Sequence, residues 1–472
     1  MITAGRGAGG HWSSHVHRGV YGTAMPHPLK LVRAMLGKTQ STFAEELAHR
    51  HQWKMGLGQM GISRSKVAGW ESGRWPPDKP TQMTIADWLG IAWADAERLG
   101  WPHMLHLFLS DTETLTAPWT PQGAIEALRS AAQQADTQPR SSYLTVTGPA
   151  VEDLAGKWQK ALSNPLPPSV REGKPIPLSV VDAARSGVGE LEGMFWDISP
   201  AHLRPLASGF LRTLITFLSE YSYDRQAGGE LFLLAARNAI LCGALLIGMG
   251  ESTRAERYFL IAARAAAAAG ETMASAMPMA YVAYCHLIAD SPGDVIPIIA
   301  AIRATAQGLL PPPFVAGLHL LEARARARLG DATAAVKSLE HADNALAADP
   351  ASTAPLAFPL GKTADIWVSS GTGITWLHLG QPEKAMKFLT RLIDEFTPAR
   401  IFPFAAYERL YIADAQIAVG DVAAAASHAA RVLDLYSSPP AIARRYEEKF
   451  TAYRDVPAVR DLLRFLAEHT TR

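Results

Sequence analysis

The sequence predicts an all-α protein in which a small helical bundle is followed by an α-solenoid, a stack of helical hairpins. Three observations support this prediction. Apolar residues recur at helical spacing, alanine runs such as residues 265–269 favour helix, and one pattern of glycines and small residues recurs four times. The 472 residues exceed one ordinary domain, and a composition of 48% apolar and 19% charged residues is ordinary for a soluble globular protein.

The chain divides into four expected segments. These are a disordered leader at 1–26, the helical bundle at 27–100, a Pro-rich linker with one docked helix at 101–180, and the repeat array at 181–472. The docked helix is expected around residues 151–162, where Leu154, Trp158 and Leu162 share one face.

The leader shows no helical, strand or secretory pattern, so a chain beginning at Met25 is expected to fold. His11, His15 and His17 have a spacing that could suit a metal ion. In a segment rich in Gly and Ser, disorder is the better interpretation.

Five helices are expected in the bundle. Leu29, Val32 and Leu36 form an apolar stripe that ends at Gly37, and Phe43, Ala44 and Leu47 form the next one. A third helix begins at Ser63, a favoured N-cap, and closes at Gly73. Ile85 and Leu89 mark a fourth helix and residues 93–99 a fifth.

Residues 51–62 form a long connection rich in glycine between the second and third helices. Two interpretations fit it: the second helix continues through Trp53 and Lys54, or a flexible wing lies beside the third helix.

The bundle is basic, whereas the rest of the chain is not. Between His27 and Pro80 nine basic residues stand against four acidic ones, a charge of +5, although the whole chain carries only +1. A basic module on a mildly acidic body is the pattern expected of a DNA-binding head.

The bundle resembles the repressor-type helix-turn-helix family called XRE or Cro-like. The family pattern is matched by Thr39-Gln40, Phe43-Ala44, Ser63, Val67, Trp70-Glu71 and Gly73. The long connection at 51–62 departs from the tight turn of that family.

The resemblance implies that the third helix reads DNA in the major groove. Arg64, Ser65 and Lys66, behind Ser63, lie at the end of the helix that reaches base edges, and Gly69 would leave room for the DNA backbone. By the same resemblance Gln40 would hydrogen-bond a phosphate and Arg74 would form a second backbone clamp. The expected DNA-binding residues are therefore Gln40, Ser63, Arg64, Ser65, Lys66 and Arg74.

The repeat array is predicted from four glycines, each preceded by an apolar residue. These are Gly250, Gly330, Gly380 and Gly420. A small residue lies seven positions before each one (Gly243, Ala323, Gly373, Ala413), and alanine lies five after (Ala255, Ala335, Ala385, Ala425). Phe259, Leu339, Leu389 and Ala429 lie nine after. This spacing resembles the tetratricopeptide repeat, and a degenerate copy at 281–302 would turn at Ser291-Pro292-Gly293.

The combination resembles actinobacterial XRE regulators with a tetratricopeptide-like C-terminal domain. It implies a cytoplasmic, homodimeric transcription regulator that binds double-stranded DNA, with a peptide, small-molecule or protein effector on the repeats. The alternative is a protein–protein adaptor that uses both helical parts without DNA. No enzyme is predicted, because no nucleophile, base and orienting group stand together, and Gly361-Lys362-Thr363 lacks the earlier glycine of a phosphate loop.

Several remaining features favour structural interpretations. Cys242 and Cys285 are expected to be buried small hydrophobes, and residues 231–250 a core helix and not a membrane span, because Arg237 and Asn238 interrupt them. No cofactor or metal is expected. Arg324 and Arg328 share a helical face that could meet an anionic ligand, but a solvated face is the preferred interpretation.

Overall fold

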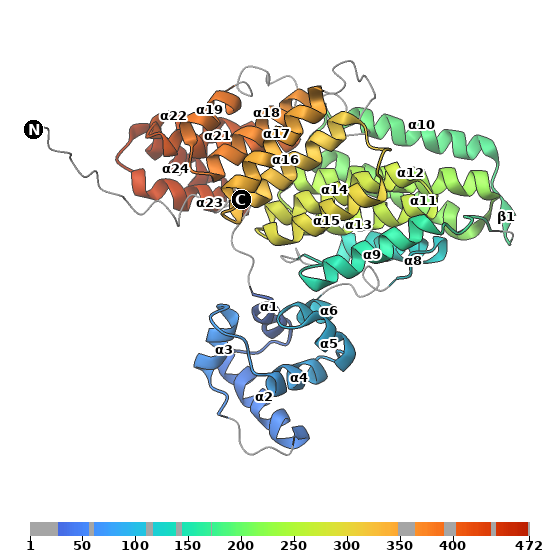
Figure 1. Ribbon diagram of the computed structural model, residues 1–472, viewed down its shortest axis with the longest axis horizontal. Helices are drawn as coiled ribbons and strands as arrows, with labels where there is room; N and C mark the ends of the chain where they lie inside the picture. The colour runs from blue at the N-terminus through green and yellow to red at the C-terminus, as the bar shows by residue number, and fades with distance from the viewer. Residues whose placement is uncertain are drawn as a thin grey trace, which may run out of the picture.

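The computed structural model describes residues 27–55, 61–109, 117–137, 144–170, 172–347, 364–390, 403–435 and 440–470. Within these residues the chain forms twenty-two α-helices and one pair of two-residue strands (Figure 1). The predicted all-α class is confirmed. The leader, with its three histidines and Met25, and the segment Gly361-Lys362-Thr363 lie outside the described residues.

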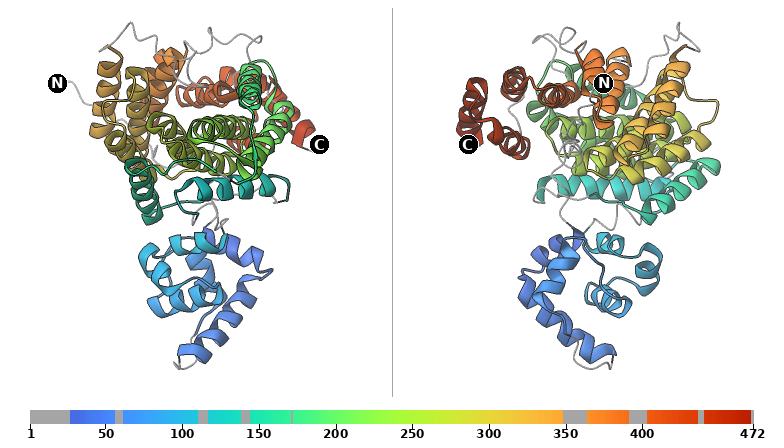
Figure 2. Two further views of the ribbon diagram at one scale, coloured as in Figure 1. Left: turned by 90° about the vertical axis from the view of Figure 1, so that its right-hand side faces the viewer. Right: turned by 60° about the vertical axis from the view of Figure 1, so that its left-hand side comes forward.

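The first part, residues 27–109, is called the head, and residues 117–470 are called the body. Figures 1 and 2 show the head as a separate unit below the body. The head comprises α1 (Pro28–Met35), α2 (Gln40–Met55), α3 (Arg64–Glu71), α4 (Lys79–Trp88), α5 (Trp93–Leu99), the 3-10 turn η1 (His103–Leu105) and α6 (His106–Leu109). The apolar stripes predicted from the sequence form its core, because Leu29, Val32, Phe43 and Leu47 have no exposed surface.

The connection between α2 and α3 is partly explained by the structure. Helix α2 runs through Trp53 and Lys54 to Met55, as the first of the two interpretations predicts. Residues 56–60 lie outside the described residues, so the wing stays untested.

Two long helices, and not one, occupy residues 117–163. Helix α9 (Pro149–Ser163) is the predicted docked helix, with Leu154 and Trp158 buried, and α8 (Pro121–Thr137) precedes it. The buried face of α8 is largely alanine, such as Ala124 and Ala127, yet its apolar stripe is as distinct as that of α9, so the sequence contained a signal for this helix that the prediction missed.

The remaining helices stack in chain order. They are α10 (Leu178–Met194), α11 (Pro200–Glu220), α12 (Arg225–Gly248), α13 (Ser252–Ala268), α14 (Thr272–Ile288), α15 (Pro292–Thr305), α16 (Pro312–Arg328), α17 (Ala332–Ala347), α18 (Ala364–His378), α19 (Pro382–Leu389), α21 (Pro403–Ala418), α22 (Val422–Leu435), α23 (Pro440–Phe450), the 3-10 turn η3 (Thr451–Tyr453) and α24 (Pro457–Thr470). Most consecutive helices pack on each other, α18 packs back on α16, and α12 also packs on α21, far along the chain. Two short strands, β1 (Lys174–Pro175) and β2 (Tyr221–Ser222), pair in parallel beside them.

The four glycines of the repeat pattern lie at the turns between paired helices. Gly250, Gly330, Gly380 and Gly420 all have positive φ, between 71° and 89°, a conformation that favours glycine over other residues. The chain therefore reverses direction at each predicted turn. The degenerate copy turns one residue before the predicted Ser291-Pro292-Gly293, because Asp290 has a φ of 62°.

The small residues of the pattern lie where paired helices touch. A Cβ added to Gly243 in α12 would lie 2.8 Å from the Phe259 ring in α13, and one added to Gly373 in α18 would lie 2.7 Å from Leu389 in α19. In these two copies the positions seven before and nine after the turn glycine are thus contact partners. This close approach explains why the spacing recurs.

Helix α12 is long and apolar enough to cross a membrane, yet 89% of its most apolar window is buried inside the protein. This burial agrees with its interpretation as a core helix. Cys242 and Cys285 are buried as predicted, and burial raises the pKa of the Cys242 thiol to about 12 and that of Cys285 well above its ordinary value.

Substitution of Gly243 tests the close approach of paired helices. We expect Gly243→Leu to lower the free energy of unfolding of the body by about 1–3 kcal/mol, because the new side chain overlaps the Phe259 ring. Gly209→Leu in α11 is the control, since a Cβ there meets nothing within 4 Å. Urea unfolding followed by circular dichroism measures both, and equal effects would contradict the packing argument.

Candidate nucleic-acid interface

The N-terminal end of α3 presents a row of exposed polar and basic side chains. The Ser63 hydroxyl caps the helix by accepting a hydrogen bond from the backbone N–H of Lys66 at 3.4 Å, and it lies 2.8 Å from the Ser65 hydroxyl. Arg64, Ser65 and Lys66 are all exposed. The opposite side of the helix packs into the head through Val67 and Trp70. One face of α3 therefore fixes the helix and the other is open.

Glu71, at the last turn of α3, joins the first three helices. Its carboxylate accepts a hydrogen bond from the Arg33 Nε of α1 and one from the Gln40 Nε2 of α2, both at 2.6 Å. Arg33 also donates to the backbone carbonyl of Lys38 at 2.7 Å. Since the Glu71 side chain is only 6% exposed, these charge-assisted bonds fix the orientation of α3 relative to α1 and α2.

Gln40 has a different surrounding from the one that the sequence suggested. Its side-chain amide holds Glu71, and the residue is half-buried. A phosphate contact from Gln40 stays a prediction.

The chain after α3 is shaped by Trp75. A Cβ added to Gly69 would lie 2.4 Å from the Trp75 ring, so the room at Gly69 is filled by this protein's own indole. The prediction that Gly69 lets the DNA backbone approach is therefore wrong. The exposed guanidinium of Arg74 lies 5.3 Å from the centroid of the Trp75 ring, within the range of a cation–π contact.

The expected DNA-binding cations are not used to hold the head together. Within the described part of the chain, the ion pairs of the head involve Arg33, Arg50, Lys79 and Arg98, and none involves Arg64, Lys66 or Arg74. These three cations thus remain on the surface around α3.

A buried segment between α8 and α9 joins the head to the body. We call residues 144–148 the strap. Glu256 of α13 accepts hydrogen bonds from the backbone N–H groups of Thr145 at 2.5 Å and Val146 at 3.3 Å, and Asp294 of α15 accepts one from Gly148 at 3.0 Å. Two carboxylates of the body therefore hold the strap by its backbone.

His286 of α14 lies between the same two carboxylates. Its Nε2 is 3.3 Å from Glu256 Oε1 and its Nδ1 is 3.3 Å from Asp294 Oδ2, at angles that make these ion pairs and not regular hydrogen bonds. Burial alone would lower the pKa of His286, but Asp294 and Glu256 outweigh burial and raise it to about 9. An imidazolium thus balances the carboxylates that hold the strap.

Residues of the head also contact the strap. His103 Nδ1 lies 2.9 Å from the Thr147 hydroxyl, and the buried His106 bonds the backbone of Leu144. Arg98 of α5 also pairs with Asp153 of α9 at 3.2 Å. Burial lowers the pKa of His103, and burial with the neighbouring His103 lowers that of His106 to about 4. The strap therefore contacts both parts.

Neither the strap nor its charged cluster is predicted from the sequence. The signal is Glu256, which is the one acidic residue of α13, and His286, which is the one ionisable side chain of its kind in the mainly apolar α14. A charge in such a helix needs a partner, but the partners come from elements distant in the chain, so the sequence does not show them.

No protein-family model, curated protein or solved structure matches this chain. What the structure defines is therefore a class: an all-helical protein of many packed helix pairs.

The charge on His286 makes the stability of the folded protein at the strap depend on pH. The folded pKa of about 9 exceeds the ordinary 6.5, so the stabilisation is complete below pH 6.5 and is lost as pH rises through 9. We expect a loss of about 3 kcal/mol over this interval. The groups that face the ring are the carboxylates of Glu256 and Asp294, with His103 beyond Asp294 and the thiol of Cys285 adjacent.

Unfolding of the full chain at pH 6.5, 7.5 and 9 measures this dependence. His286→Gln should flatten the profile, whereas His202→Gln, at an exposed position, should leave it unchanged. A wild-type slope that persists in His286→Gln would show that another group titrates.

Proposed function

We propose that the protein is a sequence-specific DNA-binding transcriptional regulator. The observation that carries the proposal is the exposed Ser63, Arg64, Ser65 and Lys66 at the N-terminal end of a short helix whose other face is core. In helix-turn-helix proteins this end of the second helix of the motif enters the major groove, where Arg, Lys and Ser side chains hydrogen-bond base edges.

In this proposal α2 and α3 form a helix-turn-helix of the XRE or Cro-like type. The Glu71 contacts with Arg33 and Gln40 favour it, because a reading helix must keep a constant angle to the rest of the head. Arg74, exposed just after α3, would contact the DNA backbone, as would the start of α2 near Gln40. A homodimer would place two such helices on a two-fold site.

The body would be a tetratricopeptide-like array that binds an effector or a partner. A stack of helix pairs offers an extended surface, and the strap gives the body a contact through which to influence the head. A coupling of about 1–3 kcal/mol between the two would change operator affinity roughly 5- to 150-fold. In this proposal the protein acts in the cytoplasm, without a catalytic step and without a cofactor.

The alternative is the adaptor hypothesis, in which both parts bind only proteins. It requires an exposed apolar surface on the head. Among the side chains of the head that the structure describes, three large apolar ones are exposed: Met35, Trp75 and Trp93. They would favour protein contact if α3 did not bind DNA. Recovery of bound DNA fragments after cross-linking in cells decides between the two and supplies the operator.

Substitutions at the end of α3 test the DNA-binding proposal. We expect Arg64→Ala to weaken operator binding by about 1–3 kcal/mol, because a side chain that reads a base is lost. Lys66→Ala should weaken binding and reduce its salt dependence by about one ion if Lys66 contacts a phosphate. Neither change should lower the melting temperature, since both side chains are exposed.

Arg464→Ala and Lys337→Ala are the matched controls, because both are exposed in the body. Fluorescence anisotropy with labelled operator, in low and in physiological salt, measures the operator affinity of the wild type and of each variant. If the double variant of Arg64 and Lys66 binds as the wild type does in both salts, α3 does not read DNA and the adaptor hypothesis is favoured.

A further inference from the structure

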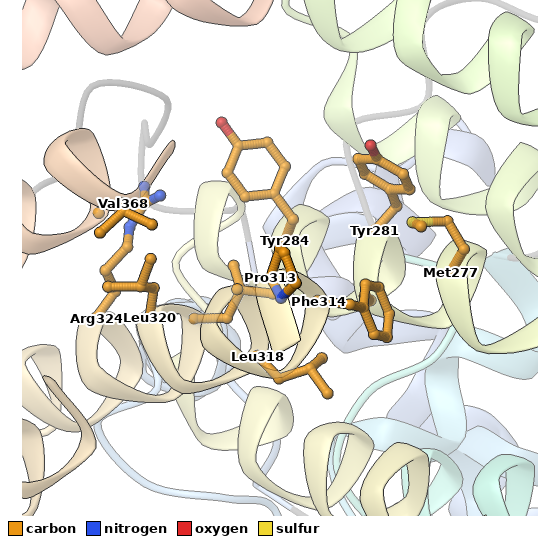
Figure 3. Close-up of a pocket in the computed structure, with 13 residues that line it drawn as sticks. Met277, Tyr281, Tyr284, Pro313, Phe314, Leu318, Leu320, Arg324 and Val368 are labelled. Carbon is orange, nitrogen blue, oxygen red and sulfur yellow. The ribbon is translucent and has the colours of Figure 1, made fainter. Parts of the chain in front are cut away.

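The two arginines that share a face of α16 lie inside the protein. Arg324 is 3% exposed, and its guanidinium carbon lies 5.5 Å from the ring centroid of Tyr284, shown in Figure 3, and 5.7 Å from that of Tyr411. The Arg328 side chain is 4% exposed and pairs with Asp290. The solvated-face interpretation of both arginines is therefore wrong. The hollow beside Arg324 in Figure 3 measures only about 70 Å³, whereas ligand sites measure roughly 300–1,000 Å³.

A larger hollow, of about 520 Å³, lies where three helical hairpins of the body turn. Its lining comes from the turn between α16 and α17, the turn between α18 and α19, and the end of α21. We call it the turn groove. Half of its ten lining residues are alanine or glycine, which leave room for a ligand: Ala327, Gly330, Ala332, Gly380 and Ala418.

Apolar side chains continue the turn groove onto the surface. Leu329, Leu379 and Val419 each directly precede a turn glycine. Leu379 lines the groove, whereas Leu329 and Val419 are 51% and 40% exposed. The repeat pattern thus places an apolar residue at the same position of three hairpins, where packing within the hairpin does not cover it. An apolar surface gathered around a groove in this way is typical of a protein contact.

The lining of the turn groove carries a negative charge. Glu383, exposed at the start of α19, lines it, and no lysine or arginine is among the ten lining residues. Within the residues that the structure describes, Glu383 forms no ion pair. Asp331 and Asp421 are exposed beside the turns, where they cap α17 and α22. An exposed carboxylate is stable in water, so Glu383 does not require a ligand, but it selects the charge of one.

Two cations near the turn groove are already in contact with other groups. Arg326 lies 3.7 Å from Asp331 and 3.5 Å from Glu322. The ammonium of Lys384 lies 3.1 Å from the centroid of the Trp376 ring. Neither cation lines the groove, so the carboxylate of Glu383 faces a ligand without a cation of its own.

We propose that the turn groove binds a short segment of a partner protein in which an apolar side chain adjoins a lysine or arginine. The apolar side chain lies over Gly330 and Gly380, where an added Cβ meets nothing within 4 Å, and the cation lies at Glu383. Leu329 and Val419 extend the apolar contact beyond the groove, which favours a polypeptide over a small molecule.

This inference deepens the proposed function, because it names the surface and the chemistry by which the body would recruit a partner. That recruitment acts on transcription only if the head binds DNA. Binding of the segment itself does not depend on DNA and is measured without it.

Selection from a phage library of random twelve-residue peptides on the full chain tests the turn groove. Each round includes counter-selection on the full chain with both Glu383→Lys and Ala332→Leu, so that only peptides that need the groove survive. We expect the survivors to place Leu, Ile, Phe or Met within two residues of Lys or Arg. Survivors without a basic residue, or no survivors, would overturn the proposal.

Fluorescence anisotropy with a labelled synthetic copy of the selected peptide assigns the site. Glu383→Lys should weaken binding at least tenfold, because a like charge replaces an opposite one. Ala332→Leu should do the same, because leucine occupies the groove. Glu190→Lys and Ala183→Leu, exposed in α10, are the matched controls and should bind as the wild type does. Binding within twofold of the wild type in both groove variants would contradict the assignment.

All four substituted residues are exposed, so circular dichroism should show unchanged melting temperatures. Sedimentation velocity of the wild type and of Glu383→Lys examines a second copy as the occupant. Self-association that Glu383→Lys abolishes would show that a second copy fills the groove and would overturn the partner segment. Operator affinity is a separate measurement: peptide binding that follows the variants in a chain that binds no DNA would uphold the groove and overturn the proposed function.

Discussion

The connection between the two parts of this protein depends on one buried charge cluster. Glu256 and Asp294 bind the backbone of residues 144–148, and the imidazolium of His286 lies 3.3 Å from each carboxylate. Unpaired carboxylates at this depth would be strongly destabilising, so the cation and the strap's N–H groups are both required. The head rests on the other side of the same segment through His103.

This arrangement gives the chain a physical route between the body and the exposed end of α3. The carboxylates that hold the strap belong to α13 and α15 of the body, whereas the exposed end of α3 belongs to a head that contacts the strap. A free linker would leave two such parts independent, but a segment held on both sides does not.

The fold was largely predictable because its rules are local. The glycine pattern gave the helix pairs: the turn glycines have positive φ, and Gly243 and Gly373 touch the residues that lie nine after the turns. The open end of α3 was also predictable, since Ser63 is a typical N-cap. Helix α8 was not predicted, although its apolar face is as distinct as that of α9, because the prolines around it were interpreted as a linker. Gly69 was misjudged because Trp75 fills its space from outside the helix.

The sequence by itself determined the helical class, the repeat and the basic end of α3, since each depends on residues within one or two turns of each other. Tertiary structure alone decided that Arg324 lies in a pocket and not on a solvated face, and that Glu256, His286 and Asp294 form one cluster. Helical periodicity shows which side of a helix a residue occupies. It does not show what covers that side, because the covering helix comes from elsewhere in the chain.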